Sequence, residues 1–395
     1  MRTCIFTLTF KINKIAKICL IHCAPIGSRG PIPECSNYNV NFFDRPFTIN
    51  EFLIALNSRS DKSAPGIDGI NYEVLHNIPH KYKIILLNIF NDTYAFESYP
   101  EEWKDIFVHF ASKPNGGVRP LALTSYCSKL FELLLSNRLR WWLETKKILP
   151  ISQAGFRKGK SCADNLTVLT LEIDNAFRNK DLVLAAFLDV TGAFNNVIID
   201  ILLKKLSKIG CSYKLINFIK FFTYKRSIFT KDTMTTPFLA YKGVPQGGVL
   251  SPLLYLIYVY KIVVNLPPGF KLLQFADDIA IYKRSSNITP MVLKEFEHAI
   301  DILNNNLKKL SLEISPTKTV FMCFNRKNKF DINNVKIKLN GLEIKASQSG
   351  RFLGIYFDTR LNFTSHILTV QANANRALNI LKFSRGIRWG ADPQT

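Results

Sequence analysis

The sequence lacks any apolar run long enough to span a membrane, which takes about 20 consecutive apolar residues. Its longest largely apolar run, residues 249–260, is interrupted by Ser251 and Pro252. Near the start, the apolar stretch of residues 4–10 ends at Lys11, too early for the hydrophobic segment of a secretory signal. We therefore predict no signal peptide, no transmembrane helix and no membrane partner, and the scattered cysteines favour a reducing intracellular compartment.

Acidic residues and cysteines are also scarce. The 395 residues include 30 Asp and Glu against 52 Lys and Arg, so the formal charge is +22. On a chain that is 47% hydrophobic, and therefore able to fold, this excess predicts a polyanionic partner, nucleic acid first and an acidic membrane face second. The eight cysteines are scattered, which argues against a disulfide framework, and the group near the start matches no common zinc spacing.

Hydrophobic periodicity separates a helical first region from a second region that contains a sheet. A capping box at residues 48–51 opens the first helix, and Ser251 with Pro252 predicts the cap and first turn of a helix over 253–264. Strands are expected at 182–190, on both sides of the turn in 271–283, at 319–324 and at 335–346, with helices between them and a basic helix over 364–388. Thr289 with Pro290 opens one of these helices, and Asn340 with Gly341 turns the last strand region back on itself. This order predicts a split βαβ sheet with helices behind it.

Three carboxylates lie at the ends of predicted buried strands. Asp189 ends one strand, and Asp277 and Asp278 occupy the turn of a hairpin. Charge at a buried strand end is unfavourable unless a cation balances it. If the strands are neighbours, Asp189 and Asp277 can hold two divalent ions, and oxygen-only ligands favour Mg²⁺. An Asp-Asp pair in a turn is also common without catalysis, so this pattern alone leaves both interpretations open.

Eight motifs in a fixed order carry a resemblance to a known family. In chain order they are residues 63–69 (SAPGIDG), 113–120 (KPNGGVRP), 153–157 (QAGFR), 187–190 (FLDV), 243–252 (GVPQGGVLSP), 275–278 (FADD), 315–319 (SPTKT) and 351–354 (RFLG). The stretch from about residue 47 to residue 392 resembles the reverse transcriptase domain of non-LTR retrotransposons, in particular the jockey-like elements of animals.

The resemblance implies an α+β fold of the right-hand polymerase type, with helical fingers, a split βαβ palm sheet and a partial helical thumb. It also implies domain boundaries. Residues 1–46 form an N-terminal extension of uncertain structure, 47–181 the fingers, 182–350 the palm, interleaved with the fingers near 213–245, and 351–395 a primer-grip hairpin and a shortened thumb.

The implied reaction is RNA-directed DNA synthesis by a nucleotidyltransferase, in which a primer 3′-hydroxyl attacks the α-phosphate of a dNTP. By resemblance, Asp189, Asp277 and Asp278 bind two Mg²⁺ ions, with Mn²⁺ as the alternative metal, and the carbonyl of Val190 is a further ligand. Lys318 resembles a lysine that protonates the leaving pyrophosphate, which is general-acid work; a surface lysine is the alternative interpretation.

The dNTP site implied by the resemblance consists of Lys113, Arg119, Gly192, Ala193, Phe194 and Gln246. In that family Lys113 and Arg119 would grip the triphosphate, Phe194 would exclude a ribose 2′-hydroxyl, and Gln246 would pack on the nascent base pair. For Lys113 and Arg119 the alternative interpretation is a solvated hairpin, and for Phe194 it is a phenylalanine of the core.

The template and primer contacts implied by the resemblance are Arg157, Lys158, Gly247, Gly248, Phe352, Leu353 and Gly354. The two glycines would let the template backbone approach closely, since they carry no side chain. The expected partners are an RNA template, a DNA primer at the target site and dNTPs, with no obligate protein partner, and a chromosomal target implies the nucleus.

The chain departs from the family at Asn195, where many relatives carry Asp. Three alternatives to an active reverse transcriptase stay open: a decayed copy that only binds nucleic acid, which Asn195 favours, an RNA-dependent RNA polymerase, and a domesticated RNA-binding protein. Phe194 and the turn at residues 275–278 argue against the second, and the three carboxylates argue against complete decay.

Overall fold

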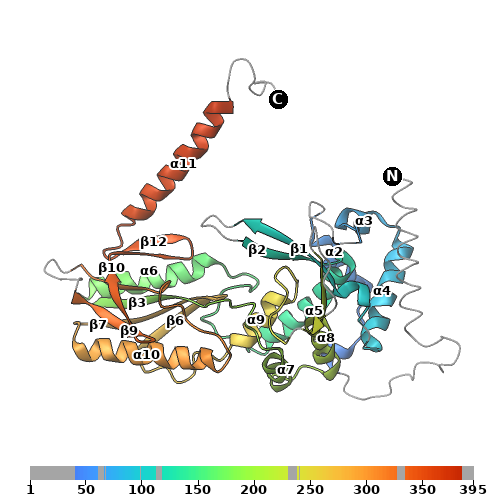
Figure 1. The fold of residues 1–395 in the computed structure, drawn as a ribbon, viewed down its shortest axis with the longest axis horizontal. Helices are drawn as coiled ribbons and strands as arrows, with labels where there is room; N and C mark the ends of the chain where they lie inside the picture. Colours follow the sequence, from blue (N-terminus) through green and yellow to red (C-terminus); the bar gives the residue numbers. More distant parts are fainter. Residues whose placement is uncertain are drawn as a thin grey trace. The chain divides into compact units, whose positions relative to one another are not determined.

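The computed structural model describes residues 41–384 apart from 61–65, 67, 98, 113–117, 230–237, 240 and 327–333. The chain divides into two compact units, of which unit 1 comprises residues 1–150 and 192–260 and unit 2 comprises residues 151–191 and 261–395. Figure 1 shows helices and strands in both, so the chain has a mixed α and β architecture. The expected N-terminal extension lies almost wholly outside the described residues.

Unit 1 is mainly helical and carries one four-stranded sheet. Its elements are η2 (Phe42–Asp44), α2 (Ile49–Asn57), α3 (Tyr72–Asn77), α4 (His80–Ala95), η3 (Glu101–Lys104), β1 (Asp105–Ser112), β2 (Val118–Leu123), α5 (Tyr126–Thr145), α7 (Ile199–Lys208), α8 (Tyr213–Tyr224), β4 (Lys225–Phe229), β5 (Phe238–Leu239) and α9 (Ser251–Val259). The sheet order is β2-β1-β4-β5, and β1 runs antiparallel to β2 but parallel to β4.

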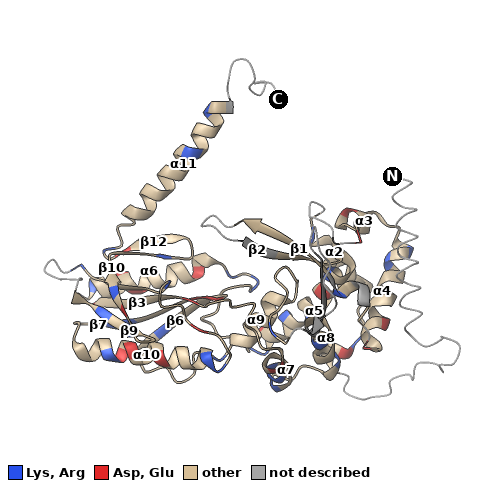
Figure 2. Ribbon diagram, viewed as in Figure 1, with Lys and Arg blue, Asp and Glu red and all other residues tan. Residues whose placement is uncertain are grey.

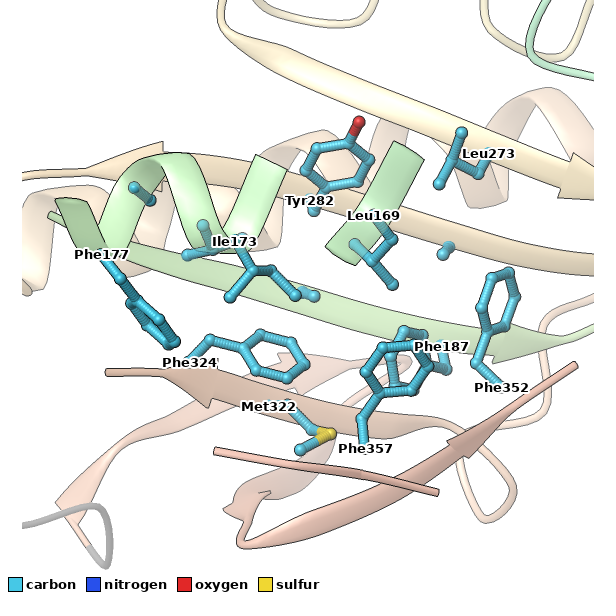
Figure 3. Packing of buried hydrophobic residues seen from close by; sticks show 14 residues of the cluster. Leu169, Ile173, Phe177, Phe187, Leu273, Tyr282, Met322, Phe324, Phe352 and Phe357 are labelled. Atoms are coloured by element: carbon cyan, nitrogen blue, oxygen red, sulfur yellow. The ribbon is translucent and has the colours of Figure 1, made fainter. Parts of the chain in front are cut away.

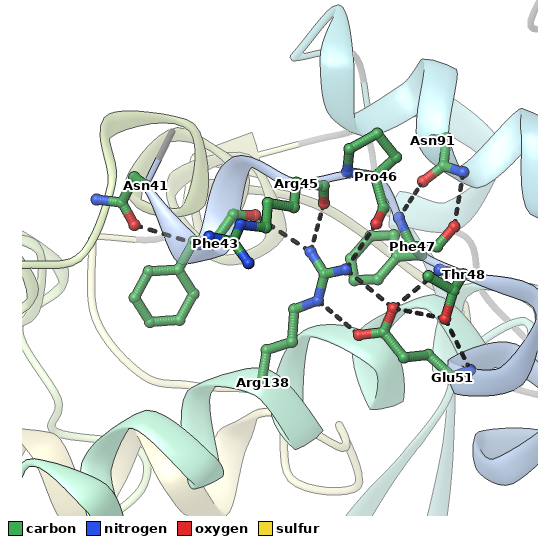
Figure 4. Close-up of polar contacts among 9 residues, drawn as sticks. All are labelled: Asn41, Phe43, Arg45, Pro46, Phe47, Thr48, Glu51, Asn91 and Arg138. Atoms are coloured by element: carbon green, nitrogen blue, oxygen red, sulfur yellow. Dashed lines mark hydrogen bonds and ion pairs between the residues drawn. The ribbon is translucent and has the colours of Figure 1, made fainter. Parts of the chain in front are cut away.

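The first helix of unit 1 is held by an arginine from a distant helix (Figure 4). Arg138, on α5, donates from Nε to Glu51 Oε1 at 2.8 Å and from a terminal nitrogen to Glu51 Oε2 at 3.0 Å. The same guanidinium donates to the carbonyl oxygens of Phe43, Arg45 and Pro46. The Arg138 side chain is only 7% exposed, so its guanidinium uses its hydrogen-bonding capacity on these acceptors and not on water.

Glu51 is also half of the predicted capping box. Its carboxylate accepts the Thr48 backbone N–H at 2.8 Å, and the Thr48 hydroxyl accepts the Glu51 N–H at 3.2 Å. The capping box is therefore confirmed, and the structure adds that Arg138 fixes its glutamate. One arginine thus joins the start of α2, the preceding turn and α5.

Unit 2 is built on a six-stranded mixed sheet. Its elements are α6 (Cys162–Arg178), β3 (Leu182–Asp189), β6 (Phe270–Phe275), β7 (Asp278–Ser285), α10 (Pro290–Lys308), β8 (Val320–Phe324), β9 (Lys336–Leu339), β10 (Leu342–Ser347), β11 (Ser349–Phe352), β12 (Ile355–Asp358) and α11 (Thr364–Ser384). The order is β6-β7-β3-β8-β10-β9, and β11 pairs with β12 in a separate hairpin. Strands β6, β7, β3 and β8 pair antiparallel in the order of a split βαβ sheet, and β10 adds to β8 in parallel.

Side chains of β3 alternate between two helices, one on each face of the sheet. On one face, Val183, Ala185 and Phe187 join the cluster that α6 covers with Leu169 and other residues (Figure 3). On the other face, Phe296 of α10 lies 5.4 Å from Phe321 of β8, between ring centroids. Burial on both faces explains why residues 182–188 form a continuous apolar run.

The hairpin β11–β12 packs on the α6 side of the sheet. The rings of Phe352 and Phe187 stack at 4.9 Å, and Phe357 lies 5.9 Å from Phe187. A Cβ on Gly350 would lie 2.7 Å from Met322 Sδ and 2.8 Å from a Val320 methyl carbon. The hairpin therefore approaches the strands closely because residue 350 carries no side chain.

The predicted elements are largely confirmed, with one clear error. Thr289 caps α10, and Asn340 and Gly341 turn β9 into β10, both as predicted. The helix predicted over 253–264 instead begins at Ser251 and ends at Val259, and Leu250 is its cap residue. The Ser251 hydroxyl makes no capping hydrogen bond to any residue that the structure describes, and a carboxylate from α5 accepts the backbone N–H groups immediately before the helix.

Positive charge is distributed over many elements (Figure 2). Lys and Arg occur on α4, α7, α10 and α11. Within the part of the chain that the structure describes, no helix is both long and apolar enough to cross a membrane.

We expect Arg138→Gln to lower the free energy of unfolding of unit 1 by about 2 kcal/mol, because it removes a partly buried ion pair and the donor for three backbone carbonyls. Urea unfolding followed by tryptophan fluorescence measures this. Lys204→Gln on α7, an exposed position, removes the same charge from the same unit and should change stability by less than about 0.5 kcal/mol. Equal losses in the two variants would contradict the assigned importance of Arg138.

Candidate active site

The predicted carboxylates meet where a strand pair ends. Asp189 is the last residue of β3 and is the register partner of Asp278, the first residue of β7. Asp277 lies in the turn between β6 and β7. The structure therefore brings together the three aspartates that lie far apart in the sequence, all within unit 2.

The backbone beyond β3 is held against a neighbouring segment. The Ser315 N–H donates to the Asp189 carbonyl at 2.9 Å, and the Thr191 N–H donates to the Glu313 carbonyl at 2.9 Å. Val190 forms an isolated bridge with Ile314 between these two bonds. Val190, predicted to supply a metal-ligating carbonyl, therefore lies on a fixed stretch of backbone beside the carboxylates.

Mutual repulsion marks the three carboxylates as one electrostatic group. The pKa of Asp278 rises to about 6, first because surrounding protein removes its hydration, then because Asp277 and Asp189 carry negative charge nearby. Arg351 of β11 opposes this rise. A cation bound beside the three carboxylates would relieve this repulsion and favour the ionised form of Asp278.

Lys318 supplies positive charge to the same group. Its Nζ lies 3.0 Å from Asp189 Oδ2, in a pair whose side chains are 66% and 38% exposed. Lys318 therefore contacts a carboxylate of the candidate site, and its role as a proton donor stays a prediction.

The carboxylates suit a hard divalent cation by donor chemistry, because every candidate ligand is an oxygen. The arrangement of these oxygens is not yet that of a metal site. Among the residues that the structure describes, no group of three or more His, Cys, Asp or Glu side chains converges as a metal-binding set. Asp189 is engaged by Lys318, so an ion held there would have to displace that ammonium.

The predicted template and primer residues of unit 2 occupy two loops. Arg157 donates to the Gln153 carbonyl at 3.0 Å, and Lys158 beside it is exposed. Phe352 is buried against the sheet, whereas Leu353 and Gly354 form the tip of the β11–β12 hairpin, with φ angles of 47° and 89°. The predicted primer-grip segment is thus a hairpin, and its role in binding primer stays a prediction.

The predicted dNTP residues that the structure describes most fully lie in unit 1. The Phe194 ring stacks on Tyr255 of α9 at 4.9 Å, and its carbonyl accepts the Val244 N–H at 3.0 Å. Ala193 is buried, and Gly192 has φ of 58°, a conformation that favours glycine. Lys113 lies outside the described residues, and Arg119 is placed only by its backbone in β2.

Gln246 is held by two other segments of unit 1. Its amide donates to Asn195 Oδ1 at 3.0 Å, and its carbonyl accepts the Ala122 N–H at 2.8 Å. A Cβ on Gly247 would lie 2.7 Å from the Ala122 carbonyl oxygen, and one on Gly248 would lie 2.8 Å from the Ser251 hydroxyl. The chain's own packing therefore requires glycine at residue 247, where the contact is with backbone, and restricts residue 248 to a small side chain or none, whatever approaches the loop from outside.

Sequence reasoning missed a buried carboxylate behind this loop. Glu132 of α5 is fully buried, and its Oε2 accepts the Val249 N–H at 2.7 Å and the Leu250 N–H at 3.2 Å. Burial raises its pKa from the ordinary 4.5 to about 7, although these two N–H groups oppose the rise. The only signal in the sequence was a glutamate on the apolar face of a predicted helix.

Comparison with known proteins defines the class of this fold and site. Residues 111–357 match the family described as reverse transcriptase (RNA-dependent DNA polymerase). The chain therefore belongs to the reverse transcriptase family, as its motifs had indicated.

The particular relatives are proteins of non-LTR retrotransposons. The probable RNA-directed DNA polymerase from transposon BS of Drosophila melanogaster is 30% identical over 82% of this chain and 37% of its own length. The RNA-directed DNA polymerase from mobile element jockey of the same species is 28% identical over 78% of this chain and 35% of its own length. This chain thus spans little more than a third of the relatives that it matches.

Among solved structures, the apo telomerase of Candida tropicalis, truncated from its C-terminal domain, aligns with a TM-score of 0.46. The alignment has 17% identity over 66% of this chain and 54% of that chain. That likeness is too distant to support an inference.

Glu132 predicts a pH dependence of stability. Because its folded-state pKa of about 7 lies above its ordinary 4.5, its contribution is fully present below about pH 4.5 and is lost as the pH rises through 7. We expect the free energy of unfolding of Glu132→Gln to rise relative to that of the wild type by up to about 3 kcal/mol between pH 5 and pH 8. Urea titrations at both pH values measure the difference, and a difference independent of pH would show that the carboxyl does not titrate as described.

Proposed function

We propose that this chain is an RNA-directed DNA polymerase that adds dNTPs to a primer 3′-hydroxyl on an RNA template. The observation that carries the proposal is the meeting of Asp189, Asp277 and Asp278 at the end of one strand pair, in a chain of the reverse transcriptase family. The names of the BS and jockey proteins as RNA-directed DNA polymerases support it.

In this proposal, unit 2 corresponds mainly to the palm, with the β11–β12 hairpin as primer grip and α11 as the start of the thumb. Helices α2 to α5 and the β1–β2 hairpin of unit 1 belong to the fingers. The predicted boundaries, fingers over 47–181, palm over 182–350 and primer grip and thumb over 351–395, are part of the proposal. So is a nuclear location, which follows from a chromosomal target.

Asp189, Asp277 and Asp278 would hold two divalent ions, Mg²⁺ or Mn²⁺, together with the Val190 carbonyl. Such ions, when bound, increase the acidity of the attacking hydroxyl and stabilise the charge on the leaving pyrophosphate. The chain's own contribution is to hold the carboxylates at fixed strand ends, since orientation accounts for a large share of rate acceleration.

Lys318 would donate a proton toward the departing pyrophosphate oxygen after leaving Asp189. Its high exposure supports this role, because a side chain that is 66% exposed can change partner at little cost. Arg157 and Lys158 would contact template phosphates. Lys113 and Arg119 would bind the triphosphate, together with Gly192, Ala193, Phe194 and Gln246.

A second candidate function is nucleic-acid binding without catalysis, as in a decayed or domesticated copy. Asn195 is the observation that favours it, because an amide stands where many relatives carry a carboxylate. Binding in that case would depend on phosphate contacts and would fall steeply with salt, and it would not depend on the aspartates.

Primer extension on an RNA template with dNTPs and Mg²⁺ tests the proposal. We expect Asp277→Asn to lower the single-nucleotide rate by at least about 100-fold, because a carboxylate is needed to hold the ion. Asp301→Asn, on the exposed face of α10, removes the same charge from the same unit and should keep the rate. Asn195→Asp run in parallel separates the second candidate, since activity only in that variant would mark a decayed copy.

The proposed role of Phe194, exclusion of a ribose 2′-hydroxyl, gives a separate prediction. Phe194→Val should lower the preference for dNTPs over ribonucleotides by about tenfold or more, because a smaller side chain leaves room for a 2′-hydroxyl. Competitive incorporation of dATP and ATP measures it, with Phe221→Val on α8 as the matched control in the same unit. An unchanged preference in Phe194→Val would refute this role of Phe194. A preference of the wild type for ribonucleotides would favour the RNA polymerase alternative.

A further inference from the structure

The residue immediately before Asp277 has an unfavourable backbone conformation. Ala276 has φ of 58°, in the left-handed region. For a residue with a Cβ this conformation costs about 1–2 kcal/mol, and it persists only when the surroundings impose it. Since Ala276 lies in the turn that leads into Asp277, whatever imposes it also orients that carboxylate.

Gln153 binds both polar backbone groups of Ala276. Its Oε1 accepts the Ala276 N–H at 3.0 Å, and its Nε2 donates to the Ala276 carbonyl at 3.4 Å. The N–H belongs to the peptide before Ala276 and the carbonyl to the peptide after it, so one side-chain amide links the two peptide planes. Fixing both planes fixes the φ and ψ angles between them.

The Gln153 amide is itself fixed. Its Oε1 also accepts the Gly155 N–H at 2.9 Å, and its Nε2 also contacts Gln274 Oε1 at 3.3 Å. Gln153 and Gln274 are both 1% exposed, so neither amide can readily exchange its partners for water. The backbone around Gln153 adds a parallel bridge to Gln274, with the Ala154 N–H donating to the Gln274 carbonyl at 2.9 Å.

Gly155 allows this contact to form. A Cβ at that position would lie 2.2 Å from the Ala276 nitrogen and 2.9 Å from the Phe275 carbonyl carbon. Any side chain at residue 155 would push the loop away from the turn. Two members of the motif at residues 153–157 thus meet at one residue of the motif at residues 275–278.

We propose that Gln153 is a positioning residue, which holds Ala276 in the left-handed conformation and thereby fixes the direction of Asp277. The inference rests on the proposed function only in taking Asp277 as a catalytic carboxylate. Misplacement of a reacting group by about 1 Å can lower a rate by about 100-fold. Loss of the Gln153 amide should therefore reduce the rate of nucleotide addition in molecules that remain folded.

The test compares Gln153→Met, which keeps an unbranched side chain of similar length, with Asn165→Leu. Asn165 of α6 is 4% exposed, and its Nδ2 donates to the Gln274 carbonyl at 2.8 Å. Asn165→Leu thus removes a buried amide hydrogen bond from the same strand but leaves the contacts of Gln153 with Ala276. Rapid-quench extension gives the active fraction as the burst amplitude and the addition rate separately.

We expect Gln153→Met to lower the addition rate at least about tenfold, with unchanged affinity for primer–template. Asn165→Leu should lower the burst amplitude or the thermal midpoint but keep the rate. Adding Ala276→Gly to Gln153→Met should recover at least about threefold of the rate, because glycine adopts a left-handed conformation without strain. Equal rates in Gln153→Met and the wild type, or equal losses in Gln153→Met and Asn165→Leu, would overturn the inference.

Hydrogen exchange provides a readout that does not need catalysis. We expect Gln153→Met to speed amide exchange in a peptide spanning residues 270–285 by at least about tenfold, with little change in residues 319–325 of the same sheet. A uniform increase over both peptides would mean that Gln153 only stabilises the unit. If the wild type extends no primer, the proposed function fails, and the exchange result alone decides whether Gln153 holds the turn.

Discussion

The burial of β3 on both faces is the constraint on which the rest of unit 2 depends. Its register against β7 and β8 cannot shift by one residue, because a shift would move every apolar side chain to the opposite face of the sheet. Once that register is fixed, Asp189 must lie opposite Asp278 at the end of the pair. The same packing that stabilises the sheet therefore forces two negative charges together, and the chain has to manage the repulsion.

Positive charge reaches this point from segments later in the chain. Lys318 precedes β8, the other neighbour of β3, and Arg351 lies on the hairpin that stacks Phe352 against Phe187. Both cations come from elements whose apolar contacts place them, so packing and electrostatics depend on each other. The balance is incomplete, since the pKa of Asp278 remains raised to about 6. An incompletely balanced acidic group differs from an ordinary surface ion pair, and it is consistent with a site for cations.

The sequence predicted those features whose signals are local. The capping box at Thr48, the cap at Thr289, the turn at Asn340 and the strand ending at Asp189 are each written in a few adjacent residues, and all are confirmed. The cap of α9 was predicted wrongly, and the acceptor for the N–H groups just before that helix, Glu132, lies more than a hundred positions earlier in the chain, where no local pattern could indicate it. Gln153 was noted only as a member of the motif at residues 153–157. Its contact with Ala276 could not be predicted, because the motif does not indicate which distant backbone groups its side-chain amide binds. Gly247 and Gly248 were assigned to the template, whereas contacts within the chain already restrict side chains at both positions.

Asn195 shows how a departure from a family pattern can be weighed physically. Its Oδ1 accepts a hydrogen bond from Gln246 at 3.0 Å, and a carboxylate oxygen would accept the same bond. The substitution therefore preserves the contact that orients Gln246 and changes the charge beside it. A change that removed the contact would free only the Gln246 side chain, because Ala122 and Glu132 hold the backbone of the loop of residues 243–250. Loss of one negative charge near an otherwise maintained loop is a change in electrostatics, so the amide alone does not require a decayed site.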